Sequence, residues 1–173
     1  AANSTANKCS VMCHALAARR CLALNTLLDH DVRLIAGAMT HPRFLSRLVW
    51  NVKTKWGWAP ATARRCLQLY SEARRQSPEL RALRRDELMS VCTLGDPWCL
   101  EVALSELGGS CFMDDPFVMQ HVITHQPGET AIGLLMLPGA PAYNGGQSIM
   151  LRAAVLAQKL PVVTLLVNPP ADR

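Results

Sequence analysis

Apolar residues recur at helical spacing through the first half of the chain. The pattern predicts a series of short helices over about residues 11–28, 32–39, 44–55, from Pro60 onward, from Ser77 onward and over about 97–107. Pro60 and Pro97 suit the first position of a helix, and Ser77 and Asp96 suit the N-cap before one. Helices this short depend on tertiary packing for their stability. No internal repeat is evident.

Beyond Gly109 the pattern changes to short apolar runs rich in β-branched residues. Three of these runs predict strands: Phe117 to Thr124, Ile132 to Leu137 and Val162 to Val167. Between the second and third runs, a glycine-rich loop is followed by an amphipathic helix that ends near Lys159. The chain is therefore predicted to be α+β, with a basic helical part over residues 1–92 and a small α/β domain over residues 93–173.

The glycine-rich loop is Gly145-Gly146-Gln147-Ser148, and it precedes a predicted helix N-terminus. Glycines at such a place let free backbone N–H groups approach an anion, so the loop is a candidate phosphate-binding site. Turn chemistry alone also explains a Gly-Gly pair between a strand and a helix. The loop lacks the lysine of a Walker motif and the spacing of a dinucleotide fingerprint. Arg152, one turn into the helix, either holds a phosphate or is a solvated surface residue.

Charge is divided unevenly along the chain. Residues 1–90 carry 15 Lys and Arg against 6 Asp and Glu, whereas residues 91–173 carry 3 against 7. Such a division indicates either a basic face for an anionic partner, most commonly DNA, or a set of solvated helix faces. The candidates for contacts with the DNA backbone are Arg64, Arg65, Arg74, Arg75, Arg81, Arg84 and Arg85.

Length and composition narrow the class of protein. The 173 residues, half of them apolar, suit one domain or a small domain with a helical extension. No apolar run reaches about 18 residues, the length that spans a membrane, and no secretory signal is visible at the start. The seven cysteines have no framework spacing, so they are expected to be reduced thiols of a cytoplasmic protein.

Three carboxylates are candidates for chemistry near the loop. Asp114 and Asp115 could hold a divalent metal such as Mg²⁺, and Glu129 could activate water, although each is also typical of a solvated turn. His121 and His125 lie four residues apart, which on the predicted strand separates them by roughly 13 Å. A shared zinc ion is therefore not expected.

The order of elements over about residues 95–168 resembles the ParB N-terminal domain and sulfiredoxin, which share one small α/β fold. The likeness rests on the helix ending at Gly109, the run from Phe117, the Gly145-Gly146-Gln147-Ser148 loop and the Pro161-Val162-Val163 segment. It implies nucleotide binding at this loop. The paired arginines of ParB-like proteins and the cysteine of sulfiredoxin are both missing. Arg152 is the nearest substitute for the arginines, and reductase chemistry is not expected.

The whole layout is similar to that of plasmid fertility-inhibition factors of the oncogenic-suppression type. This resemblance implies a factor that binds and hydrolyses ATP, uses Mg²⁺ and cleaves DNA to block transfer of a competing DNA element. Glu129 and Arg152 would then be catalytic. Whether the chain is an enzyme stays open, because two alternatives remain. One is a non-catalytic inhibitor that docks on a DNA-transfer ATPase or complex, and the other is a Rossmann-like nucleotide-binding module.

Overall fold

The computed structural model describes residues 11–18, 20–30, 33–41, 43–54, 60–137, 140 and 147–169. Within these ranges every regular element is a helix and no strand is present. The predicted α+β class is therefore wrong. The resemblance to the ParB/sulfiredoxin fold is wrong for the same reason, since that fold is built around strands that residues 95–137 and 147–168 do not form.

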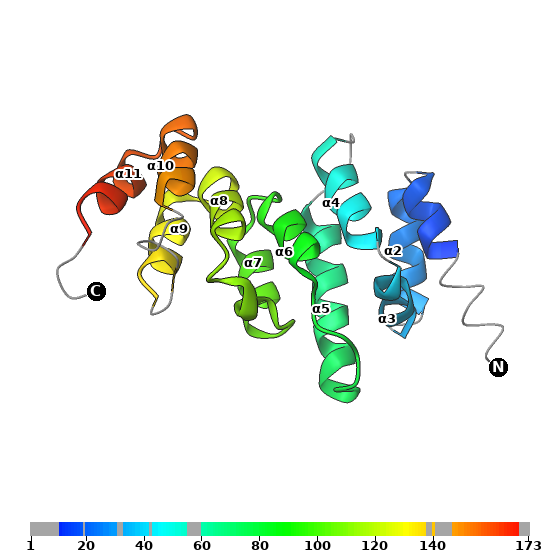
Figure 1. Ribbon diagram of the computed structural model, residues 1–173. Coiled ribbons are helices and arrows are strands. Elements are labelled where there is room, and N and C mark those ends of the chain that lie inside the picture. The colour runs from blue at the N-terminus through cyan, green and yellow to red at the C-terminus, as the bar shows by residue number, and fades with distance from the viewer. Residues whose placement is uncertain are drawn as a thin grey trace.

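The helices stand side by side in a row, from α2 at one end to α11 at the other (Figure 1). Residues 11–17 form a first short helix. The elements that follow are α2 (Cys21–His30), α3 (Arg33–Thr40), α4 (Phe44–Thr54), α5 (Pro60–Gln76), α6 (Arg85–Cys92), α7 (Pro97–Ser105), the 3₁₀ turn η1 (Gly109–Phe112), α8 (Pro116–His125), α9 (Gly128–Leu135), α10 (Gln147–Leu156) and α11 (Leu160–Val167).

Consecutive helices form hairpins that stack on one another. Helices α4, α6, α8 and α10 each pack on the next of the four, while α3 packs on α5, α5 on α7, and α9 on α11. The buried side chains form one continuous cluster from Met12 to Leu166. This arrangement is an α-solenoid, in which each hairpin contacts mainly its neighbours. The domain division at residues 92 and 93 stays a prediction.

The last three hairpins repeat with a regular period. Helices α6, α8 and α10 begin at Arg85, Pro116 and Gln147, so the two intervals between their starts are equal. Their partners α7, α9 and α11 begin at almost the same spacing. Corresponding positions of the three hairpins are buried: Leu88, Met119 and Met150; Val91, Val122 and Ala153; Cys92, Ile123 and Ala154; Leu100, Ala131 and Val162. The chain therefore has a structural repeat that is not evident in its amino-acid sequence.

The three predicted strands lie in helices, and each of these helices carries a buried pair at i,i+4 spacing. The pairs are Val118 and Val122 in α8, Ala131 and Leu135 in α9, and Val162 and Leu166 in α11. A proline at the start of α8 and α11 fixes a helical φ where a helix does not need the N–H. Packing of these buried faces outweighs the β-propensity of valine and isoleucine, which is a weak preference.

The predictions for the first half fare better. The helices expected near 32–39 and 44–55, from Pro60 and from Pro97 are confirmed as α3, α4, α5 and α7. The helix predicted over 11–28 is divided into residues 11–17 and α2. Ser77 does not cap a helix, because α6 begins only at Arg85.

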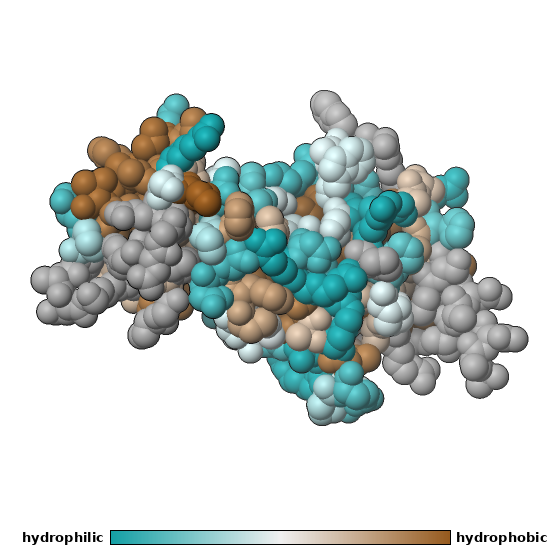
Figure 2. Space-filling model, in the orientation of Figure 1, coloured by the Kyte–Doolittle hydropathy of each residue, from teal (hydrophilic) through white to brown (hydrophobic). Residues whose placement is uncertain are grey.

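Surface character differs along the stack. Apolar surface gathers over α10 and α11, while teal, hydrophilic surface covers much of the middle (Figure 2). None of the helices that the structure describes is both long enough and apolar enough to cross a membrane.

Candidate functional site

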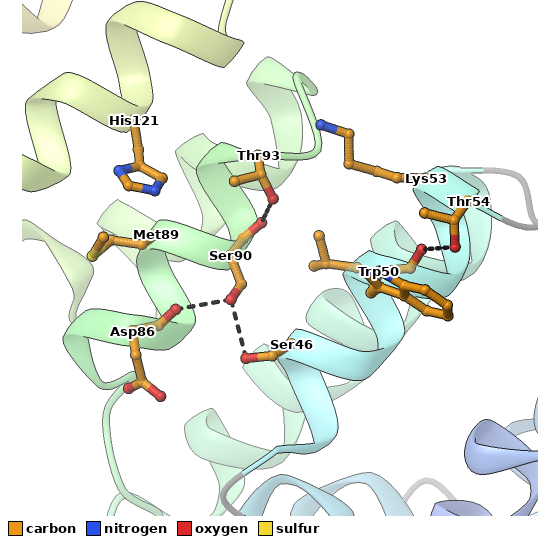
Figure 3. Close-up of a pocket in the computed structure, with 10 residues that line it drawn as sticks. Ser46, Trp50, Lys53, Thr54, Asp86, Met89, Ser90, Thr93 and His121 are labelled. Carbon is orange, nitrogen blue, oxygen red and sulfur yellow. Dashed lines mark hydrogen bonds between the residues drawn. The ribbon is translucent and has the colours of Figure 1, made fainter.

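A groove crosses three successive hairpins on the side of α4, α6 and α8 (Figure 3). It has a volume of about 620 Å³. Its walls are formed by Ser46, Val49, Trp50, Lys53 and Thr54 of α4, Asp86, Met89, Ser90 and Thr93 of α6, and His121 of α8. Stacked hairpins commonly bind partners across such a surface, because neighbouring repeats extend it along the molecule.

Hydroxyl groups line the floor of the groove, and hydrogen bonds hold them to the helices. The Ser90 hydroxyl donates to the carbonyl of Asp86 at 2.8 Å, so the Ser46 hydroxyl is the donor in the 3.1 Å bond that joins α4 to α6. Thr54 and Thr93 donate to the backbone carbonyls of Trp50 at 2.7 Å and Ser90 at 2.6 Å. These protons all go to backbone or to the other serine. The hydroxyls therefore offer lone pairs to a ligand.

The groove provides an apolar anchor between polar ends. Trp50 is 50 % exposed on the α4 wall, and Met89 is partly buried on α6. Aromatic and thioether side chains offer large contact areas to an apolar group of a ligand. Lys53 and Asp86 are exposed and add one charge of each sign.

His121 points from α8 into the groove (Figure 3). Its Nδ1 lies 3.0 Å from the carbonyl oxygen of Phe117, so Nδ1 carries the proton and Nε2 of the neutral ring is an acceptor. One turn later, burial lowers the pKa of His125, and the charges of Lys53, His121 and Lys159 lower it further. His125 is therefore less readily protonated than a free histidine, and the cation that lines the groove is Lys53 of α4.

All seven arginines that were predicted to contact DNA are engaged within the molecule. Six form ion pairs: Arg64 with Asp96, Arg65 with Asp29, Arg75 with Glu106, Arg81 and Arg84 with Glu87, and Arg85 with Asp115. Arg74 donates to the carbonyls of Leu80 and Glu106. DNA contact by these side chains stays a prediction, and such contact competes with the internal partners.

These ion pairs also account for part of the uneven charge. Asp96, Glu106 and Asp115 belong to the acidic second half, and their arginine partners belong to the basic first half. Each pair joins one hairpin to the next, α5 to the segments at either end of α7 and α6 to the start of α8. The charge division along the sequence thus serves the stacking of the hairpins.

Glu87 is the most deeply buried of the paired carboxylates, and the sequence did not single it out. It is 1 % exposed and accepts two hydrogen bonds from Arg81, at 2.6 and 2.7 Å, and one from the Arg84 amide at 2.9 Å. Burial alone would raise its pKa, but the bonds from Arg81 and Arg84 hold the pKa below the ordinary value. Glu87 lies three residues after Arg84, the N-cap residue of α6, which is the position of the glutamate in a capping box. That spacing is the one sequence signal that indicates Glu87.

Of the predicted acidic candidates, Asp114 and Asp115 lie at the start of α8 and Glu129 lies at the start of α9, and Mg²⁺ binding by them stays a prediction. Asp115 caps α8 by accepting from the amides of Phe117 and Val118, and its pairing with Arg85 lowers its pKa. Asp114 is exposed, and Glu129 is exposed in the first turn of α9. No cluster of three or more potential metal ligands occurs in the part of the chain that the structure describes.

The predicted phosphate loop lies largely outside the described residues, which exclude Gly145 and Gly146 and the side chain of Gln147. Gln147 begins α10 and Ser148 is exposed in its first turn. The segment before the loop is helix α9, so the strand–loop–helix premise is wrong. Arg152 is exposed on α10 and lines a separate hollow of about 580 Å³ between α8 and α10.

The geometry of His121 and His125 also differs from the prediction. Both lie on one face of helix α8, with ring centroids 5.9 Å apart, so the strand-based separation is wrong. A third ligand is missing from the residues around them that the structure describes.

No known protein family, curated protein or solved structure matches the chain.

The buried thiols are unreactive at neutral pH. Cys66, Cys92 and Cys99 are buried and carry no disulfide, and burial raises the pKa of each to about 12. A thiol with so high a pKa is not a nucleophile at neutral pH. These cysteines serve the core.

Proposed function

We propose that the chain is a non-catalytic binding module that holds a segment of a partner protein in the groove across α4, α6 and α8. The observation that carries this proposal is the half-exposed Trp50 in a groove that spans three hairpins. Tryptophan is enriched among the few residues that supply most of the energy of protein interfaces. An extended segment suits an elongated groove better than a compact small molecule does.

The side chains that line the groove indicate which residues the bound partner segment should carry. An apolar side chain of the segment would pack on Trp50 and Met89, and a neighbouring carboxylate would lie near Lys53. Backbone N–H groups of the segment would donate to the lone pairs of the floor hydroxyls. Docking on a partner of this kind agrees with the predicted non-catalytic alternative, an inhibitor of a DNA-transfer ATPase or complex.

The test is selection of peptides from a displayed random library on the full chain. Peptides that bind the wild type should carry an apolar residue beside a carboxylate. They should bind the Trp50→Ala variant at least about tenfold more weakly, as expected for an interface tryptophan. Trp98→Ala is the matched control, because Trp98 is 36 % exposed on α7 and lies outside the groove.

Two results would contradict the proposal. One is a library that yields no specific peptide. The other is equal weakening by Trp50→Ala and Trp98→Ala, which would place the binding surface elsewhere.

ATP hydrolysis and Mg²⁺-dependent DNA cleavage stay predictions, as do cytoplasmic location and a DNA-transfer complex as partner. The segment predicted as the strand before the loop is helix α9, and a Rossmann-like module would need a parallel sheet that the described residues lack. Assays of ATP hydrolysis and of plasmid DNA cleavage, each with and without Mg²⁺, test these two activities. The Glu129→Ala and Arg152→Ala variants show whether the predicted residues carry it.

A further inference from the structure

The hollow between α8 and α10 adjoins the groove. Its volume is about 580 Å³, and Phe117, Gln120 and Thr124 of α8 line one wall. His121, the residue that follows Gln120 on the same helix, lines the groove. The two concave surfaces therefore meet on α8. Together they cross the four helices α4, α6, α8 and α10, each of which packs on the next.

The structural repeat places the same helix positions on both surfaces. Met89 and Thr93 of α6 line the groove. Gln120 and Thr124 occupy the equivalent positions of α8, one repeat later, and they line the hollow. Because neighbouring repeats of a solenoid present equivalent positions on one side, the groove and the hollow open on the same side of the stack. A segment that lies in the groove can therefore extend into the hollow.

The side chains that line the two surfaces carry unpaired positive charge. Lys53 of the groove and Arg152 of the hollow are exposed, and neither has a carboxylate partner within the part of the chain that the structure describes. Asp86 is the one carboxylate among the lining residues of these two surfaces, and its Oδ1 lies 3.7 Å from Nε of Arg84. An anionic partner complements the two cations, because opposite charges on two surfaces favour association.

The surroundings of these cations suit a peptide better than a nucleic acid. Phe117 and Leu156 of the hollow are 49 and 73 % exposed and offer apolar surface to a ligand. A nucleic-acid strand carries a phosphate on every nucleotide, so its binding site usually provides cations all along the strand. Here Lys53 and Arg152 lie on helices that are separated by α6 and α8, and Asp86 of α6 lies between them. Well-separated carboxylates on a partly apolar segment fit this arrangement.

We propose that the partner segment in the groove extends over α8 into the hollow, where Arg152 binds a second carboxylate of the segment. This inference rests on the proposed function. The side-chain amide of Gln120, which lines the same hollow, supplies further N–H donors to that carboxylate. Phe117 and Leu156 pack against an apolar side chain beside it. The partner is therefore an acidic segment with one carboxylate near Lys53 and another at Arg152.

The spacing of the helices sets the distance between the two carboxylates. Packed helices lie about 8–10 Å apart, and three such steps lead from α4 to α10. An extended segment advances roughly 3.3 Å per residue, so about seven to nine positions separate its two acidic residues. A shorter peptide reaches only one of the two cations.

Fluorescence anisotropy tests the proposal with labelled peptides that are selected on the full chain from a random library long enough to cross all four helices. The tight binders should carry two acidic residues about seven to nine positions apart. Arg152→Ala should weaken their binding about tenfold, through loss of a charge-assisted contact. Changing the second acidic residue of the peptide to its amide should weaken binding to the wild type by the same factor and should not weaken binding to the Arg152→Ala variant further. Because this last change is in the peptide, its effect on the wild type does not depend on how the variant folds.

Arg20→Ala is the control, because Arg20 is an exposed arginine just before α2 that lines neither surface. It should leave binding unchanged. Peptides that lose affinity with Trp50→Ala but not with Arg152→Ala would overturn this proposal and leave the proposed function standing. A library that yields no peptide sensitive to Trp50→Ala would overturn both. A single-stranded oligonucleotide that displaces the peptides and loses affinity with Arg152→Ala would identify nucleic acid as the occupant, which also contradicts the proposal.

Discussion

The hairpins of the middle of the stack and those at its α11 end are joined by different forces. Ion pairs tie α5 to the segments at either end of α7, and α6 to the start of α8. No ion pair joins α8 and α9 to α10 and α11 within the described residues, where Lys159 instead donates to two carbonyls. The small side chains of Ala153 and Ala154 are buried there and allow α10 to pack closely on α8.

The difference shows that one stacking geometry can be fixed in two ways. Charged ties have directed partners and set the register of neighbouring hairpins. An apolar junction depends on shape and on close packing. The basic character of the first half therefore does not by itself indicate an anionic ligand, since three of its arginines pair with carboxylates of the second half.

The largest effect is expected where a charged tie is buried. Glu87→Ala should lower the free energy of unfolding by about 3–5 kcal/mol, because it leaves the Arg81 charge without its carboxylate partner. Urea unfolding followed by far-UV circular dichroism measures the change. Glu79→Ala removes an exposed carboxylate and should stay within about 0.5 kcal/mol of the wild type. A loss of similar size in both variants would show that Glu87 has no special role.

The apolar junction should respond to loss of volume. Met150→Ala should cost about 2–5 kcal/mol, because Met150 is fully buried between the last hairpins. Since each hairpin contacts mainly its neighbours, hydrogen exchange should accelerate in α10 and α11 and stay unchanged in α4. Thr164→Ala, at an exposed position of α11, is the control. Uniform acceleration along the chain would mean that the stack unfolds as a single unit.

The smallest effect concerns the titration of a charged tie. Pairing with Arg85 lowers the pKa of Asp115, so its contribution to stability is complete above the ordinary carboxyl pKa and is lost as pH falls through the lowered pKa. Asp115→Asn keeps an N-cap residue but removes the charge. The wild type should be more stable than this variant at neutral pH, and the difference should vanish in acid. Asp115→Ala also removes the cap and should cost a further ~1 kcal/mol. Unfolding curves over a pH series measure both, and a difference that is independent of pH would contradict the pairing.

Much of the helical first half could be predicted, because its signals are local. The Asp96-Pro97 cap and Pro60 start helices as expected. The same Asp-Pro signal at Asp115-Pro116 predicts a turn before a strand, because the valines that follow have high β-propensity. Only their burial on neighbouring hairpins, which is a tertiary effect, makes that segment helical.

The site was less accessible to sequence reasoning. The sequence indicates that the arginines matter, but the carboxylate partners of Arg64, Arg75 and Arg85 lie 30 to 32 residues away, and no local pattern pairs them. The groove draws on three helices that are brought together only by stacking. The repeat likewise lies in which positions are buried. Leu88, Met119 and Met150 occupy equivalent buried positions but are not all the same amino acid.

The Ser46–Ser90 hydrogen bond, which joins two hairpins beneath the groove, has a mechanical consequence. In a stack held by contacts between neighbours, small changes in the angle between adjacent hairpins add up along the stack, so the molecule bends easily. A peptide bound across α4, α6 and α8 would restrain the angle between α4 and α6 and the angle between α6 and α8. Its binding would stiffen the middle of the molecule.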